Sequence, residues 1–156
     1  MSTISTTSSA DGSLIGRLAA LRAGLARFPR PLLELMARLA VGATFFKSGL
    51  VKIASWDVTV GLFADEYKVP ILPPEIAAYL GAAAELTCPV LIVLGLFTRL
   101  GAAALLGMTL VIQIFVYPEN WAEHLMWATI LLYLLTRGPG PISLDRPFAQ
   151  RLFGDK

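Results

Sequence analysis

The sequence has few of the residues on which cofactor-binding soluble enzymes depend. It contains one cysteine, Cys88, and one histidine, His124, and only 15% of its 156 residues are charged. A single cysteine excludes an intramolecular disulfide and a cysteine-based zinc site, and a single histidine excludes a bis-imidazole haem within one chain. The sequence also lacks a glycine-rich phosphate loop in a strand–helix context, a Ser/His/Asp set and a basic patch suited to nucleic acid. It therefore predicts no metal, no cofactor bound through a motif of its own and no nucleic-acid partner.

The composition is instead that of a membrane protein. Hydrophobic residues make up 56% of the sequence, and its mean hydropathy is +0.67. Soluble domains are about 45–50% apolar and about a quarter charged, so we expect the lipid bilayer to be a partner. The first residues are rich in Ser and Thr and lack the basic start and apolar core of a signal peptide. We expect residues 1–13 to form a disordered tail.

Four apolar segments have the length, or nearly the length, of roughly 20 residues that a membrane-spanning helix needs. They lie at residues 31–54, 75–97, 99–117 and 120–136. Prolines before or after the segments, and the stretch RGPGP after the last, mark helix starts and stops. The junction at Thr98 is so short that the helices on either side of it must form an antiparallel hairpin. The sequence thus predicts an all-α fold, an antiparallel four-helix transmembrane bundle that forms one domain over residues 31–146.

Basic residues are distributed unevenly among the connections. Four arginines precede the first segment, Arg99 lies between the second and third, and four basic residues follow the fourth. The two other connections carry only Lys68. By the positive-inside rule, both termini and the Arg99 turn face the cytoplasm, and residues 147–156 form a cytoplasmic tail.

Two segments outside the bundle have amphipathic character. Residues 14–30 combine arginines with an apolar stripe, which predicts a basic helix lying in the membrane interface; the alternative is a cytoplasmic helix packed on the bundle. The stripe consists of Leu14, Leu18, Leu21, Leu25 and Phe28. The connection at 56–74 is half apolar, so we expect a short surface helix or a lid over the outer mouth of the bundle.

Polar side chains on all four predicted helices fall at similar depths, given a rise of 1.5 Å per residue. Such residues are costly in lipid and usually face the bundle interior. We expect them to form an intramembrane polar cluster, the main candidate site, made of Lys47, Glu85, Gln113 and His124. Secondary candidates are Arg38, Lys52, Trp127 and Arg99.

The two lysines of the first segment call for different explanations. Lys52 is close enough to the outer interface for its ammonium group to reach water. Lys47 lies deeper, and we expect it to need a partner, with Glu85 or an acidic residue of the outer loops as the candidate. Arg38 follows Glu34 by four residues, which favours a salt bridge on the helix surface.

His124 and the aromatic residues near it leave two alternatives open. The histidine can relay protons or hydrogen-bond a ligand carbonyl, or make a structural hydrogen bond within the bundle. An aromatic, partly polar cavity would suit a flat lipophilic ring such as a quinone head group; an aromatic belt with ordinary core packing is the other interpretation. Cys88 lies three residues after Glu85, and we interpret it as a small core residue.

Three stretches together resemble the DoxX family of bacterial membrane proteins, and the resemblance covers residues 31–146. They contain Phe46, Gly49 and Lys52; Glu85 followed by Gly95-Leu96-Phe97-Thr98-Arg99; and Gly138-Pro139-Gly140 followed by Ser143-Leu144-Asp145. The resemblance implies a four-helix protein of the bacterial inner membrane. It also implies a link to the DoxD-type subunit of thiosulfate:quinone oxidoreductase, to complexes that handle thiol and oxidative stress, and to copper-responsive peptide-modification systems. It assigns no catalytic residue.

These observations support three functional hypotheses. The first is a subunit of a redox or stress-response system, in which electrons from a sulfur- or metal-stress partner would reduce a quinone bound between the helices. The second is a non-enzymatic anchor that holds a partner complex through the basic N-terminal arm and the cytoplasmic turn. The third is a small transporter or channel. A partner protein or a homo-oligomer is expected in each.

Overall fold

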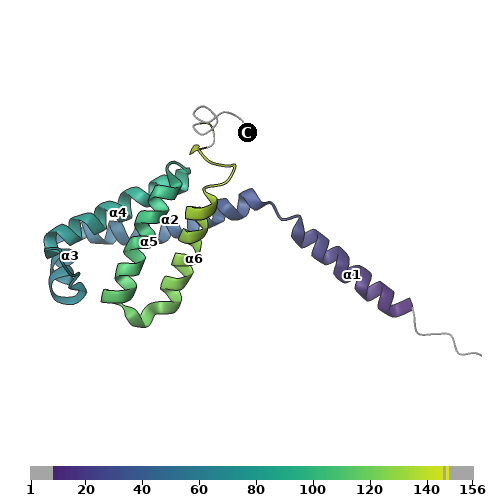
Figure 1. The fold of residues 1–156 in the computed structure, drawn as a ribbon, viewed down its shortest axis with the longest axis horizontal. Coiled ribbons are helices and arrows are strands. Elements are labelled where there is room, and N and C mark those ends of the chain that lie inside the picture. Colours follow the sequence, from purple (N-terminus) through teal and green to yellow (C-terminus); the bar gives the residue numbers. More distant parts are fainter. Residues whose placement is uncertain (1–8, 146, 148–156) are drawn as a thin grey trace, which may run out of the picture. The chain divides into compact units, whose positions relative to one another are not determined.

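The computed structural model describes residues 9–145 and residue 147. Within them the protein is built of six α-helices and three short helical segments, without a strand (Figure 1). The all-α prediction is therefore confirmed. The predicted cytoplasmic tail, residues 147–156, lies outside the described residues except for Pro147. The chain divides into two compact units, residues 1–30 and 31–156, which are described separately.

The first unit contains helix α1, Ser9–Ala26. The helix begins at Ser9, inside the predicted tail and before the predicted start at residue 14; residues 1–8 lie outside the described part. It ends at Ala26 rather than at residue 30, because Pro29 disfavours helical backbone at the residue before it. The leucines of the predicted stripe are all exposed on α1.

The second unit contains four long helices that coincide with the four predicted segments. They are α2 (Arg30–Ala54), α4 (Pro74–Leu94), α5 (Thr98–Val111) and α6 (Trp121–Arg137). Helix α5 continues into a π-helical segment, η2 (Ile112–Val116). Among the described residues, two stretches qualify as membrane spans by length and composition, Pro74–Leu94 and Thr98–Val116. Helix α2 carries several charged residues and α6 is short, which keeps both below that criterion.

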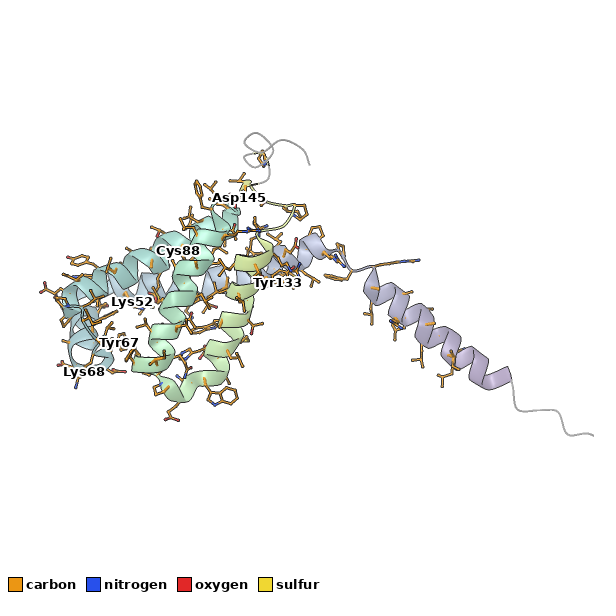
Figure 2. The ribbon with its side chains drawn as sticks, viewed as in Figure 1. Lys52, Tyr67, Lys68, Cys88, Tyr133 and Asp145 are labelled. Carbon is orange, nitrogen blue, oxygen red and sulfur yellow. The ribbon has the colours of Figure 1, made fainter. Side chains whose placement is uncertain are left out.

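The α4–α5 turn is closed by the C-terminal stretch of the described chain. Gly95 and Phe97 adopt the left-handed backbone conformation, with φ of 68° and 48°. The Asp145 carboxylate accepts hydrogen bonds from the Phe97 and Thr98 amides, at 2.8 and 3.2 Å, and so caps the start of α5. The Asp145 amide in turn donates to the Gly95 carbonyl at 2.8 Å. Figure 2 places Asp145 beside this turn.

The connection between α2 and α4 folds as short helices, as predicted for residues 56–74. Helix α3 (Trp56–Leu62) runs into the π-helical segment η1 (Phe63–Tyr67). In the stretch that follows η1, Lys68 and Ile71 have positive φ angles of 42° and 79°. A β-branched residue rarely adopts such an angle. A 3-10 turn, η3 (Pro118–Asn120), links η2 to α6.

The core lies between α2, α4, α5 and α6. Its buried members are Val41, Phe45, Ile92, Ala102, Leu105, Leu131 and Leu134, and Cys88 packs against them, half-buried. Gly42 and Gly49 allow α2 to approach α4 closely: a Cβ atom at Gly42 would lie 2.5 Å from Val93, and one at Gly49 would lie 3.0 Å from Glu85. Small residues at helix contacts are typical of membrane bundles.

Candidate functional site: an aromatic cavity beside a buried ion pair

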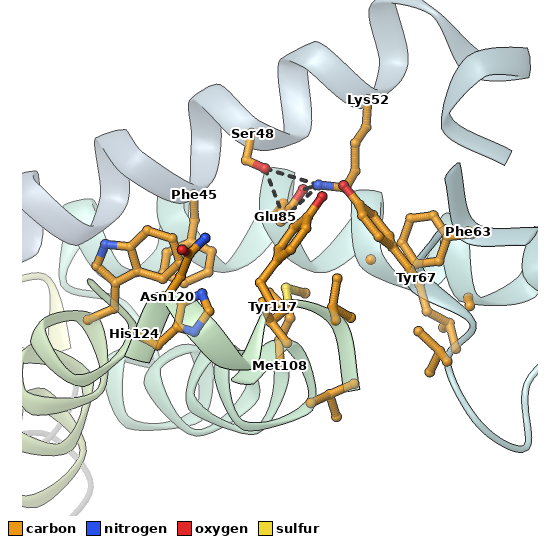
Figure 3. Close-up of a pocket in the computed structure, with 18 of the residues that line it drawn as sticks. Phe45, Ser48, Lys52, Phe63, Tyr67, Glu85, Met108, Tyr117, Asn120 and His124 are labelled. Carbon is orange, nitrogen blue, oxygen red and sulfur yellow. Dashed lines mark hydrogen bonds and ion pairs between the residues drawn. The ribbon is translucent and has the colours of Figure 1, made fainter. Parts of the chain in front are cut away.

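A cavity of about 440 Å³ lies among α2, α4, η2, α6 and the η1 segment (Figure 3). Most of its wall is aromatic or aliphatic. The aromatic residues in the wall are Phe45, Phe63, Tyr67, Tyr117 and Trp127. The Phe45 and Trp127 rings meet edge to face, with centroids 5.3 Å apart, an arrangement that aromatic pairs prefer. The aromatic residues therefore form a preorganised apolar wall.

A buried ion pair forms part of the wall. Lys52 Nζ on α2 lies 2.9 Å from Oε1 and 2.7 Å from Oε2 of Glu85 on α4. Ser48, one helical turn before Lys52, donates a hydrogen bond to Glu85 Oε1 at 3.1 Å, and its oxygen accepts one from Lys52 at 3.0 Å. The Lys52 side chain is 16% exposed and that of Glu85 is 4% exposed. Pairing the two charges is what makes their burial tolerable.

The predicted partner of Glu85 was wrong, because Lys47 does not reach it. Lys47 is exposed on α2 and lies outside the cavity wall. At 100° per residue, Lys52 lies about 60° around the helix from Gly49, which faces α4, whereas Lys47 lies about 160° away. Depth along the helix suggested Lys47 as the partner of Glu85, but the direction in which each side chain leaves the helix makes Lys52 the partner.

His124 and Gln113 come together as predicted for two members of the cluster. His124 on α6 is 4% exposed and lines the cavity. Its Nδ1 lies 2.7 Å from Gln113 Oε1, and Gln113 Nε2 donates to the Pro118 carbonyl at 2.8 Å. The His124 ring also packs on Trp127, with centroids 5.3 Å apart. Gln113 lies behind the histidine and outside the cavity wall, so it orients the ring.

A hydrogen bond that the sequence analysis did not predict lies beside the cavity. The Tyr117 hydroxyl, at the end of η2, donates a hydrogen bond to Glu66 Oε1 in η1. This bond raises the pKa of Tyr117 above its usual range, because losing the proton would leave two negative charges side by side. The Tyr67 and Tyr117 rings meet edge to face at 5.7 Å. The bond therefore ties the connection between α2 and α4 to the end of η2.

Arg38 lies at the opposite end of α2 and takes no part in the cavity. It is 1% exposed and donates hydrogen bonds to the carbonyls of Val93, at 3.2 Å, and Ile142. The predicted surface salt bridge with Glu34 was therefore wrong: the Arg38 side chain turns into the bundle, while Glu34 accepts a hydrogen bond from Tyr133 at 3.2 Å.

Arg99 also lies outside the cavity. It is exposed at the start of α5, and its Nη2 donates to the Thr136 carbonyl at 3.4 Å. Of the secondary candidates, Lys52 and Trp127 thus belong to the cavity wall. Across the described residues, no group of three or more His, Cys, Asp or Glu side chains is arranged to hold a metal ion.

Two comparisons relate this chain to known proteins. The model of the DoxX family matches residues 33–118. The chain is 35% identical over 130 residues to "Inner membrane protein YphA" of Escherichia coli, covering 75% of this chain and 91% of that protein. It is 28% identical over 126 residues to an uncharacterized protein of Haemophilus influenzae, covering 71% and 80%. No solved structure matches the chain significantly.

Proposed function

The chain belongs to the DoxX family and lies in the bacterial inner membrane, and on that basis we propose that it is an integral subunit of a redox or stress-response system. Its cavity would bind the head group of a membrane quinone. The observation that carries the proposal is the cavity wall: aromatic rings on one side, with a buried Lys52–Glu85 pair and the buried His124 beside them.

We propose that all four long helices cross the membrane, with both termini in the cytoplasm. Basic residues gather at the Arg38 end of the bundle, before α2, at the α4–α5 turn and after α6. The positive-inside rule assigns that end to the cytoplasm. Many large apolar side chains on the bundle's outer surface are exposed, which suits contact with lipid. The cavity then lies in the outer half of the membrane.

The dimensions and chemistry of the cavity support a flat ring as ligand. Ligand pockets typically enclose about 300–1,000 Å³ and combine an apolar wall with a few polar groups that fix orientation. At about 440 Å³, this cavity has room for a substituted ring. Quinone heads are flat and lipophilic, and they reach such a site from the bilayer.

Electrons would come from a partner protein, because the sequence has no cofactor-binding motif of its own. The family resemblance points to partners that handle thiols, sulfur or metal stress. A single quinone site in the membrane subunit and a redox centre in the partner would divide the reaction between two proteins. A second copy of this chain is the alternative partner.

The proposal is tested by the quinone content of the protein purified in mild detergent. We expect about one quinone per chain in the wild type and in Lys47→Met, since Lys47 lies outside the cavity. Glu85→Gln should lose most of the quinone while retaining the size-exclusion profile of the wild type. Absence of quinone from the wild type, together with no binding of added quinone, would overturn the proposal.

An anchoring role is the second candidate, favoured by α1. Its exposed leucines lie on one stripe with arginines to either side, as in helices that bind anionic lipid or a partner. Charge reversal at Arg17, Arg22 and Arg27 would abolish function in cells if anchoring is the main role, while Glu85→Gln would be tolerated. Substrate-dependent flux in proteoliposomes would instead favour the transporter.

A further inference from the structure

We propose that the cavity recognises a ring hydroxyl, and so prefers the reduced hydroquinone to the quinone, through His124 Nε2 acting as a hydrogen-bond acceptor. This inference rests on the proposed function, which places a flat ring in the cavity. It adds which redox form of the ring, quinone or hydroquinone, the polar atoms of the cavity wall would bind more tightly.

The orientation of Gln113 sets the polarity of the histidine. The Pro118 carbonyl can only accept a hydrogen bond, so the atom 2.8 Å from it must be the Gln113 amide nitrogen. The amide oxygen then faces His124 Nδ1 at 2.7 Å. An amide oxygen also only accepts, and therefore Nδ1 carries the hydrogen.

A neutral imidazole has one donor and one acceptor nitrogen. With the hydrogen held on Nδ1, Nε2 presents a lone pair. Within the described part of the chain Nε2 has no hydrogen-bond partner, although His124 is 96% buried and lines the cavity. Its lone pair is therefore open to the cavity, where a ligand hydroxyl would donate to it.

The ion pair is largely satisfied within itself. Lys52 donates hydrogen bonds to the Ser48 hydroxyl at 3.0 Å and to Glu85 Oε1 at 2.9 Å, and Ser48 donates to Glu85 Oε1 at 3.1 Å. Glu85 Oε2 lies 2.7 Å from Lys52 Nζ and is buried. The acceptor that the wall presents to a ligand is therefore His124 Nε2.

The remaining polar groups do not reverse this preference. Glu123 lines the cavity as a further acceptor, and the Tyr117 hydroxyl is committed to Glu66. Asn120 and Tyr67 can donate or accept, and both are more exposed than His124. A quinone carbonyl would meet an acceptor at His124 Nε2. A hydroquinone brings a donor there.

The test compares two ligands of nearly equal size, 4-butylphenol and 4-butyltoluene, which differ by a hydroxyl in place of a methyl group. Binding to the detergent-purified protein is followed by quenching of tryptophan fluorescence, because Trp127 lies in the wall. His124→Phe keeps an aromatic ring beside Trp127 but lacks Nε2, and Lys47→Met is the matched control. Comparing the phenol-to-toluene affinity ratio between proteins cancels the difference in how the two ligands partition into the detergent.

We expect this ratio to fall about 2- to 12-fold in His124→Phe, the equivalent of one neutral hydrogen bond, and to stay unchanged in Lys47→Met. A smaller fall in Gln113→Met, which frees the ring to adopt either tautomer, would support the orienting role of Gln113. In the wild type, a hydroquinone analogue should bind more tightly than the corresponding quinone, a measurement that needs no variant.

Two failures are distinguishable. If the aromatic ligands bind but quinone binds as tightly as hydroquinone, or the ratio is the same in His124→Phe as in the wild type, the preference for a hydroxyl is overturned while the cavity remains a ring-binding site. If none of the ligands binds the wild type, the proposed function is overturned as well.

Discussion

Helix α2 buries a cation near each of its ends, and the two are accommodated differently. Arg38 donates to backbone carbonyls of Val93 and Ile142, at an end closed by the chain segment that reaches Asp145. Lys52 pairs with the Glu85 carboxylate in the wall of a cavity. Backbone carbonyls are fixed by the fold, whereas a carboxylate belongs to a side chain that can change its partner. The comparison teaches that Arg38 helps to close one end of the bundle, whereas Lys52 forms part of the cavity wall on which the proposed binding rests.

The largest effect is expected at the cavity end. Lys52→Met leaves Glu85 buried without its partner, which costs about 3–5 kcal/mol, so we expect a strongly lowered unfolding temperature in detergent. Lys47→Met, on the exposed side of the same helix, should change stability by less than about 0.5 kcal/mol. Adding Glu85→Leu to Lys52→Met should restore most of the stability. No rescue in the double variant would contradict the pairing.

Arg38→Met should cost somewhat less, about 2–4 kcal/mol, because two carbonyls lose their donor at about 1–3 kcal/mol each and Ile142 lies in an exposed segment. Removing the Glu34 carboxylate should not restore the stability lost in Arg38→Met, whereas Glu85→Leu is expected to restore that lost in Lys52→Met. The matched control is Arg99→Met, whose side chain is exposed. Thermal unfolding in detergent measures all three, and equal losses in Arg38→Met and Arg99→Met would contradict this account.

Asp145→Ala tests how the Arg38 end is closed. The variant removes both hydrogen bonds to the start of α5, and loss of a helix cap costs typically about 1 kcal/mol. Ligand affinity at the cavity should not change, because the cap lies at the other end of the bundle. A loss of affinity with unchanged unfolding temperature would show that the two ends are not independent.

Tyr117→Phe should have the smallest effect, a loss of about 0.5 kcal/mol, because the bond to Glu66 is exposed. The pKa of Tyr117 is raised in the folded protein, so the contribution is present at neutral pH and is lost as pH rises beyond the ordinary tyrosine value of about 10. The difference between wild type and variant, followed by unfolding at several pH values, should shrink at alkaline pH. A difference that grows with pH would refute the assignment.

Much of the fold could be predicted from local chemistry. Proline and glycine punctuation located the four long helices to within a few residues, and the shortness of the Thr98 junction required a hairpin. The start of α1 was placed too late because a Ser/Thr-rich stretch is typical of a disordered chain. The C-terminal segment could not be predicted to pair with the α4–α5 turn, since no local pattern records a contact across the chain.

At the candidate site, residue types were predicted better than partners. Glu85, Gln113 and His124 were predicted as site residues because polar side chains inside a membrane need hydrogen-bond or ion-pair partners. The structure gives each of them such a partner. The error at Lys47 came from using depth alone; Gly42 and Gly49 mark the face that meets α4, and Lys52 lies near that face. The hydrogen bond between Tyr117 and Glu66 could not be predicted, because a tyrosine and a glutamate near helix ends are common in outer loops.

Hydropathy, charge distribution and helix-breaking residues by themselves determined an all-α membrane protein with four long helices and its polar groups at depth. These properties depend on each residue's own transfer free energy and backbone preference, which the sequence states directly. Only the tertiary structure decided that Glu85 pairs with Lys52, that Arg38 binds carbonyls, and that Gln113 Oε1 lies against His124 Nδ1. Those outcomes depend on the rotation of each helix about its axis and on the contacts between helices, which no single segment encodes.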